Sequence, residues 1–154
     1  MPRGRGGKRS GGPWYGEFRE RLLFEADARS MIPDLRNGFA KQVQGAGYRL
    51  YFTVEVPHYG RRKVEVHFPK IAPRWARVFV DGRKDSPHRY RGGSLCMWEP
   101  EDPPQQRWVF EDGLAALVAH ITIHLFKEGW WRETGEWLGA EVLHAPGVKQ
   151  ESVE

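Results

Sequence analysis

The chain has 154 residues, of which 40% are hydrophobic and 13% aromatic, which suits one domain built around a single core. This composition excludes a disordered chain, and no apolar run is long enough to span a membrane. The cations of residues 1–13 account for the whole net charge of +4, so a basic nucleic-acid-binding face on the domain is not expected.

The two ends of the sequence differ in composition from its middle. Residues 1–13 are rich in glycine and contain no acid, which predicts a disordered basic tail. Its cations are Arg3, Arg5, Lys8 and Arg9. We interpret this tail as solvated, with weak contact to nucleic acid or an acidic partner as the alternative. Residues 14–145 are expected to form the domain, and residues 146–154 a flexible tail. The single cysteine and the lack of a signal peptide favour the reducing cytoplasm.

Helical spacing marks the start of the domain. Residues 15–29 are predicted to form an amphipathic helix that ends near Ser30. Its apolar positions are Tyr15, Phe18, Leu22 and Ala26. A similar spacing beyond Pro33 predicts either a second short helix or a packed loop that ends at residues 45–47. The apolar positions of this second segment are Ile32, Leu35, Phe39 and Val43.

The apolar period then changes from helical spacing to two. Residues 49–56 and 63–68 alternate between apolar and polar side chains, which is typical of half-buried strands. A turn at residues 57–60 separates them, and residues 75–80 are predicted to form a further strand before an Asp-Gly turn. Short turns imply an antiparallel sheet of three or four strands in meander order.

A second helix is predicted after an exposed, proline-rich loop at residues 99–106. Residues 113–126 carry one apolar stripe, which predicts a core helix packed on the sheet. The stripe consists of Leu114, Leu117, Val118, Ile121 and Leu125. Lys127 and Gly129 are interpreted as the end of this helix. A short irregular cap is expected to follow it, built from Trp130, Trp131, Trp137 and Leu138.

The stretch between sheet and core helix, residues 86–96, ends in Cys96, the single cysteine of the chain. Gly92 and Gly93 favour a loop here, and nearby His88, Arg89 and Arg91 would stabilise a reactive thiolate. We therefore expect Cys96 on an exposed shelf, as a nucleophile. These residues alone leave open the alternative of an inert, buried cysteine.

His120 and His124 lie four residues apart on the predicted core helix, and therefore on one face. That spacing can hold a metal only with a third and usually a fourth ligand, and no further ligand has recognisable spacing. We predict no metal site and no cofactor, and interpret both histidines as flanking the core.

The cysteine stretch and its surroundings resemble the catalytic region of ubiquitin-conjugating enzymes. A His-Pro-Asn triplet there precedes a Gly-x-hydrophobic-Cys shelf, and His88 of Ser86-Pro87-His88 stands in the asparagine place. The closer resemblance is to bacterial members found in cyclic-oligonucleotide anti-phage signalling (CBASS) systems. Their pattern is matched by His88-Arg89-Tyr90, Gly93, Leu95-Cys96 and Met97-Trp98. The resemblance covers about residues 14–145 and is specific around Cys96.

The resemblance implies an α+β protein with the ubiquitin-conjugating (UBC-like) fold. Its order is an N-terminal helix, an antiparallel meander, a cysteine loop and a C-terminal core helix. It also implies a thioester on Cys96, assisted by His88, with Arg89, Tyr90 and Trp98 as loop supports. The implied acyl donor is the C-terminus of a cGAS-like nucleotidyltransferase, with an activating enzyme as a separate protein in some systems. The alternatives are a noncatalytic scaffold of the same fold and a module whose basic tail contacts nucleic acid.

Overall fold

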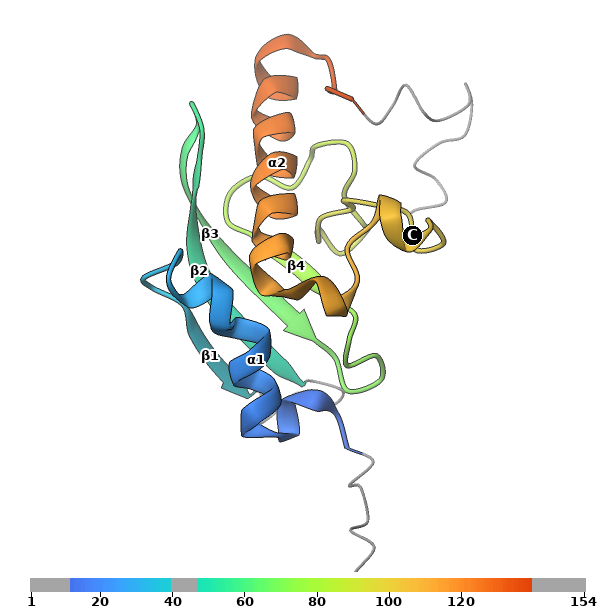
Figure 1. The fold of residues 1–154 in the computed structure, drawn as a ribbon. Coiled ribbons are helices and arrows are strands. Elements are labelled where there is room, and N and C mark those ends of the chain that lie inside the picture. Colours follow the sequence, from blue (N-terminus) through green and yellow to red (C-terminus); the bar gives the residue numbers. More distant parts are fainter. Residues whose placement is uncertain (1–11, 40–46, 140–154) are drawn as a thin grey trace, which may run out of the picture.

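The computed structural model describes residues 12–39 and 47–139, so residues 1–11 of the predicted basic tail and the predicted tail at residues 146–154 lie outside it. A four-stranded antiparallel sheet carries α2 across one face, and α1 lies beside α2 (Figure 1). The main elements are α1 (Phe18–Arg29), β1 (Arg36–Phe39), β2 (Tyr48–Val56), β3 (Gly60–Phe68), β4 (Arg77–Val80) and α2 (Gly113–Thr134). Short 3-10 turns form at Trp14–Gly16, Pro104–Gln106 and Phe110–Asp112. The predicted α+β class is confirmed, and the arrangement is compatible with a UBC-like fold.

The sheet follows the predicted meander, in the order β1-β2-β3-β4 with every pair antiparallel. In β2 and β3 the even-numbered apolar side chains from Tyr48 to Val56 and from Val64 to Phe68 are buried. This alternation produces one core face, as the period of two predicts. β1 lies where a second short helix or a packed loop was predicted, and the rest of that segment, residues 40–46, lies outside the described residues. The four residues of β1 are largely exposed and pair with β2 alone among the described strands, so they carry no apolar pattern.

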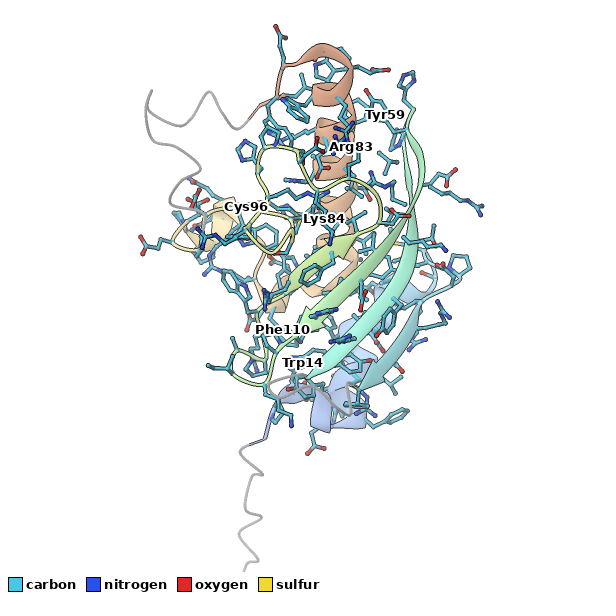
Figure 2. The ribbon with its side chains drawn as sticks, turned by 180° about the vertical axis from the view of Figure 1, so that it is seen from behind. Trp14, Tyr59, Arg83, Lys84, Cys96 and Phe110 are labelled. Carbon is cyan, nitrogen blue, oxygen red and sulfur yellow. The ribbon has the colours of Figure 1, made fainter. Side chains whose placement is uncertain are left out.

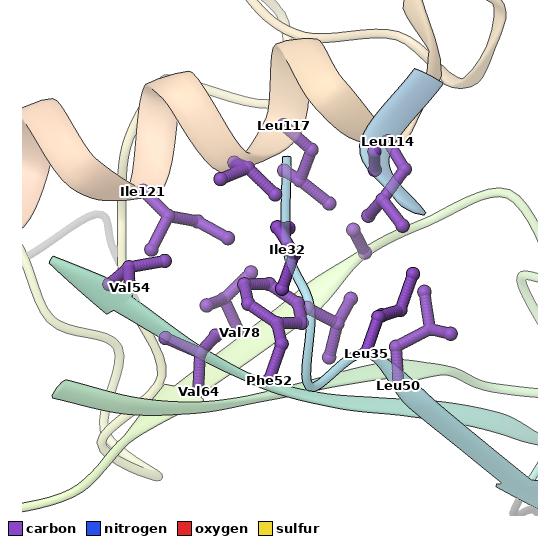
Figure 3. Packing of buried hydrophobic residues seen from close by; sticks show 14 of the residues in the cluster. Ile32, Leu35, Leu50, Phe52, Val54, Val64, Val78, Leu114, Leu117 and Ile121 are labelled. Atoms are coloured by element: carbon purple, nitrogen blue, oxygen red, sulfur yellow. The ribbon is translucent and has the colours of Figure 1, made fainter. Parts of the chain in front are cut away.

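The core lies between the sheet and α2. Leu114, Leu117 and Ile121 point from α2 toward Phe52 and Val54 on β2, as Figure 3 shows. The five residues of the predicted stripe are all buried, which confirms it. Nowhere in residues 12–39 and 47–139 is there a helix of the length and apolarity needed to cross a membrane.

The predicted apolar face of the first helix is wrong. Phe18 and Leu22 are exposed, and the buried residues of α1 are Phe24, Glu25 and Ala28. A 3-10 turn places Tyr15 in the core before α1 begins. Helical spacing counted from Tyr15 therefore does not identify the buried face of α1. Glu25 occupies a core position because the Tyr48 hydroxyl donates a 2.6 Å hydrogen bond to it and Arg29 donates another at 3.0 Å.

The predicted end of the core helix is also wrong, because α2 continues past Gly129 to Thr134 and includes both Trp130 and Trp131. A Cβ at Gly129 would lie 2.5 Å from the ring of Tyr59, so this glycine serves packing and not a cap. The cap is Gly135, at φ 80°, whose N–H donates to the carbonyl of Trp131. The chain then turns back, and Trp137 is buried, as expected for a cap over the helix.

Candidate functional site

Residues 88–96 form a small antiparallel hairpin, called here the cysteine hairpin. The N–H of Cys96 donates to the carbonyl of His88 at 2.8 Å, and that of Tyr90 donates to Ser94 at 2.9 Å. Gly93, at φ 91°, closes the three-residue turn, a conformation that favours glycine. Residues directly opposite each other in such a pair project to the same face. His88 and Cys96 are such a pair, so the hairpin holds their side chains next to each other.

Two attachments hold the hairpin in place. The N–H of Leu95 donates to the carbonyl of Val78 on β4 at 2.9 Å. On the other side Arg89 forms a two-pronged ion pair with Glu128 of α2, at 2.9 and 2.8 Å, and also donates to the carbonyl of Gly93 at 2.7 Å. Both charged side chains are almost completely buried, at 3% and 1% exposed. Figure 2 shows Cys96 on this loop region, beyond the edge of the sheet.

The buried ion pair has a clear electrostatic consequence. Burial alone would raise the pKa of the Glu128 carboxyl, but the nearby His124 ring and the hydrogen bonds and charge of Arg89 lower it to about 2. Glu128 is therefore ionised at neutral pH and neutralised by Arg89. Arg89 is thus paired with Glu128, on the opposite face of the hairpin from Cys96. The expectation that Arg89 activates the thiol is wrong for this structure.

Cys96 itself is not on an exposed shelf. The residue is only 5% exposed, which corrects the prediction. Burial raises the pKa of the thiol to about 11, the carboxylates of Glu99 and Asp102 add to the rise, and a hydrogen bond with the Tyr90 side chain opposes it. The thiol also donates to the carbonyl of Trp98 at 3.8 Å. In this state the sulfur is a neutral, covered thiol and not an activated thiolate.

Cys96 nevertheless opens onto a small pocket of about 70 Å³ between the hairpin and α2. Its lining consists of His88, Cys96, Met97, His120, Ile123, His124, Lys127 and Trp137. The structure thus brings the predicted pair Cys96 and His88 together, and their catalytic roles stay predictions. His88 has φ 59°, a left-handed conformation in which histidine is more common than most residues.

Trp137 is the cover of this pocket. Its ring centroid lies 4.5 Å from that of His88 and 5.1 Å from that of His124. Gly135 makes this contact possible by reversing the chain at the end of α2. Sequence reasoning assigned Trp137 to a cap over the helix, but not to the cysteine site, because 41 residues separate it from Cys96.

The two helix histidines, interpreted from sequence as flanking the core, also line this pocket. Burial lowers the pKa of both His120 and His124, so both are neutral at pH 7. Nε2 of His124 lies 3.5 Å from a carboxylate oxygen of Glu128, which connects the pocket to the buried ion pair. Within the described ranges, no three or more His, Cys, Asp or Glu side chains form a group that could hold a metal ion.

The predicted loop supports have different surroundings. Arg89 joins the hairpin to α2. The ring centroid of Trp98 lies 6.2 Å from that of Trp108 and 5.4 Å from that of His120. Tyr90 acts on the thiol itself, because its side chain opposes the rise in the pKa of Cys96 that burial causes. A second, larger pocket of about 290 Å³ lies on the β4 side of the hairpin. Tyr90 and Met97 line it, together with Trp75, Arg77 and Trp98.

The fold and this site define an α+β domain, compatible with the UBC-like fold, that holds one cysteine in a hairpin against its core helix. Residues 36–145 match the family model described as "Type II CBASS E2 protein", and the chain belongs to this family. The family resemblance seen in the sequence is confirmed, and membership indicates an E2-like role in bacterial antiviral CBASS defence. No curated protein and no solved structure matches the chain.

Proposed function

We propose that Cys96 accepts the C-terminal carboxyl group of another protein as a thioester and passes it to an amine. Loading forms a bond between the sulfur and the activated carbonyl carbon, while the activating group leaves with the electron pair. Transfer forms a bond from the amine nitrogen to that carbon and breaks the C–S bond, so the sulfur leaves as a thiolate. The observation that carries this proposal is the pairing of Cys96 with His88 in one pocket of a chain from an E2 family.

His88 is proposed to act on the transfer step. Its ring lines the same pocket as the sulfur, and its backbone is fixed to Cys96 by the hairpin hydrogen bond. An imidazole there can donate a hydrogen bond to the oxyanion of the tetrahedral intermediate or take the proton from the attacking amine. The neutral rings of His120 and His124 provide further proton acceptors in the pocket.

The donor that we propose is the C-terminus of a cGAS-like nucleotidyltransferase, activated by a separate protein, in the bacterial cytoplasm. This assignment follows from the family, whose members act with other CBASS components. The alternative is a noncatalytic scaffold that binds partners without acylation. One observation favours it: the thiol is covered, and its pKa is raised to about 11.

Trapping the acyl group separates these two functions. In cells that carry the chain's own neighbouring genes, Cys96→Ser should accumulate an oxyester, because an oxygen ester reacts far more slowly with amines. That adduct should survive thiol reductant and yield to mild base, and mass spectrometry should find the donor C-terminus at position 96. Cys96→Ala should carry no adduct. No adduct on either Cys96→Ser or the wild-type protein would reject the carrier function in favour of the scaffold.

His88 is tested by measuring loading and discharge separately. His88→Ala should load donor but discharge it on the order of 100-fold more slowly, as for loss of an oxyanion donor or a general base. His58→Ala is the matched control, because His58 also has positive φ (70°) but lies in the β2–β3 turn. Native rates for both steps in His88→Ala would refute the assigned role. Failure to load would instead show that His88 shapes the loop.

A further inference from the structure

Lys127 is the only lysine among the described residues that line the pocket of Cys96. It is half-buried and lies on α2, seven residues after His120 and three after His124. Residues at this spacing share one face of a helix, and all three side chains line the pocket between α2 and the cysteine hairpin. The pocket has a volume of about 70 Å³, about that of two water molecules, so the side chains around it lie close together.

The surroundings of Lys127 suit an amine that reacts. No acidic residue is among the described residues that line this pocket. Burial lowers the pKa of His120 and of His124, and the nearby charge of Lys127 contributes to both decreases. A Cβ on Gly139 would lie 3.4 Å from Nζ of Lys127, so the amine lies beside the segment that carries the cover, Trp137. An amine, two neutral proton acceptors and a thiol therefore share one covered site.

We propose that Lys127 is a modification site, which accepts the acyl group of Cys96 within the same chain. This inference rests on the proposed function, because it needs the thioester. Lys127 first loses a proton to solvent, and its neutral amine attacks the thioester carbon to form a C–N bond. The C–S bond breaks, the sulfur leaves with the electron pair as a thiolate, and one amine proton passes through a pocket imidazole to that sulfur. The product is an isopeptide bond between the donor C-terminus and Lys127.

Proximity favours this transfer over reaction with an external amine. A nucleophile held next to its target reacts at an effective concentration far above that of free amines in solution. The thioester on Cys96 is therefore short-lived unless an external acceptor reaches it first. Without such an acceptor, the protein becomes joined to its donor by a bond that resists both thiol reductant and mild base.

A small thioester tests the transfer without any donor protein. Phenyl thioacetate should acetylate Cys96 by exchange, with thiophenol as the leaving group, and the acetyl group should then move to Lys127. Peptide mass spectrometry should find Lys127 acetylated roughly tenfold faster in the wild type than in Cys96→Ala, which reports direct acetylation by the reagent. Equal rates at Lys127 in the two proteins would overturn the proposal.

Lys84 provides the matched control for this experiment. Its side chain packs on the turn of the cysteine hairpin, because a Cβ on Gly93 would lie 2.6 Å from it, yet Lys84 is not among the described residues that line the pocket. Acetylation of Lys84 should proceed at the same rate in the wild type and in Cys96→Ala. A similar dependence of both lysines on Cys96 would show transfer without selection by the pocket, and would overturn the proposal.

The donor reaction provides the second test. In cells that carry the chain's own neighbouring genes, the wild type should carry the donor C-terminus on Lys127, and Lys127→Arg should carry only the thioester on Cys96. Arginine keeps the charge but stays protonated, so the thioester of this variant should decay roughly tenfold more slowly. A wild type that forms the thioester but no Lys127 conjugate, or unchanged decay in Lys127→Arg, would overturn the proposal. If neither the wild type nor Cys96→Ser carries an adduct, the proposed function fails, while phenyl thioacetate still reports on transfer to Lys127.

Discussion

Breaking the ion pair between Arg89 and Glu128 should strongly destabilise the protein. Both side chains are buried, at 3% and 1% exposed, and two hydrogen bonds of 2.9 and 2.8 Å join them. Removing one member of such a pair leaves an uncompensated charge in the core, which typically costs about 3–5 kcal/mol. Glu128→Gln should therefore lower the free energy of unfolding by that amount at pH 7. Urea denaturation at 25 °C measures the change.

The lowered pKa of Glu128, to which both Arg89 and His124 contribute, indicates a stabilisation of similar size. Folding lowers this pKa from 4.5 to about 2, which corresponds to about 3 kcal/mol of stabilisation. Because the folded-state pKa is the lower one, the stabilisation is fully present above pH 4.5 and is lost as the pH falls toward 2. Between those values the wild-type protein should lose about 3 kcal/mol more than Glu128→Gln does.

A double variant controls for the loss of charge itself. Replacing Arg89 and Glu128 together by methionine and leucine leaves no buried charge from this pair, and should recover most of the stability lost by either single change. The reasoning would be refuted by a Glu128→Gln cost below about 1 kcal/mol, or by parallel pH profiles for that variant and the wild type.

Three further outcomes follow from the structure. Trp137→Ala uncovers the pocket, so thiol probes should label Cys96 roughly tenfold faster, and an unchanged rate would show that Trp137 is not the cover. Tyr48→Phe removes the hydroxyl donor to the buried Glu25 and leaves the donor from Arg29, so it should cost about 1–3 kcal/mol in urea unfolding, whereas a neutral result would contradict that buried bond. Gly47→Ala would place a Cβ 2.1 Å from the carbonyl oxygen of Phe68 at the end of β3. The melting temperature of this variant should fall by several degrees, at about 2–4 °C per kcal/mol lost, and an unchanged value would contradict this packing.

The sheet and the core helix were predictable because their side chains repeat with a simple period. In β2 and α2 the buried positions are apolar at spacings of two and of three to four, which hydropathy alone detects. The face of α1 was not predictable in this way, because a charged residue, Glu25, occupies a core position there. Two partners make that burial acceptable, Arg29 one turn along α1 and Tyr48, which is distant in sequence and which no helical spacing reveals.

The resemblance to ubiquitin-conjugating enzymes predicted that His88 and Cys96 belong to one site, but it did not predict the surroundings of the pair. Arg89 was expected to activate the thiol because it lies only seven positions before Cys96 in the chain. In the structure Arg89 instead forms an ion pair with Glu128, which is 39 residues away in the sequence. Trp137, which covers the pocket, is likewise distant in sequence, because its segment folds back from the far end of α2. Contacts of this kind depend on how elements pack, and no sequence period encodes them.

The covered thiol has a consequence for how the proposed reaction begins. With a pKa of about 11, roughly one Cys96 in 10⁴ is ionised at pH 7, which is too few for rapid attack on a free donor. The largest cause of the raised pKa is burial, and Trp137 provides part of that burial from a short segment after α2. A donor that displaces this ring on docking removes part of the penalty and lowers the pKa of the thiol. Under the proposed function, the thiol is therefore unreactive in the free protein and becomes nucleophilic in the complex, so its alkylation rate should rise when the donor C-terminus is bound.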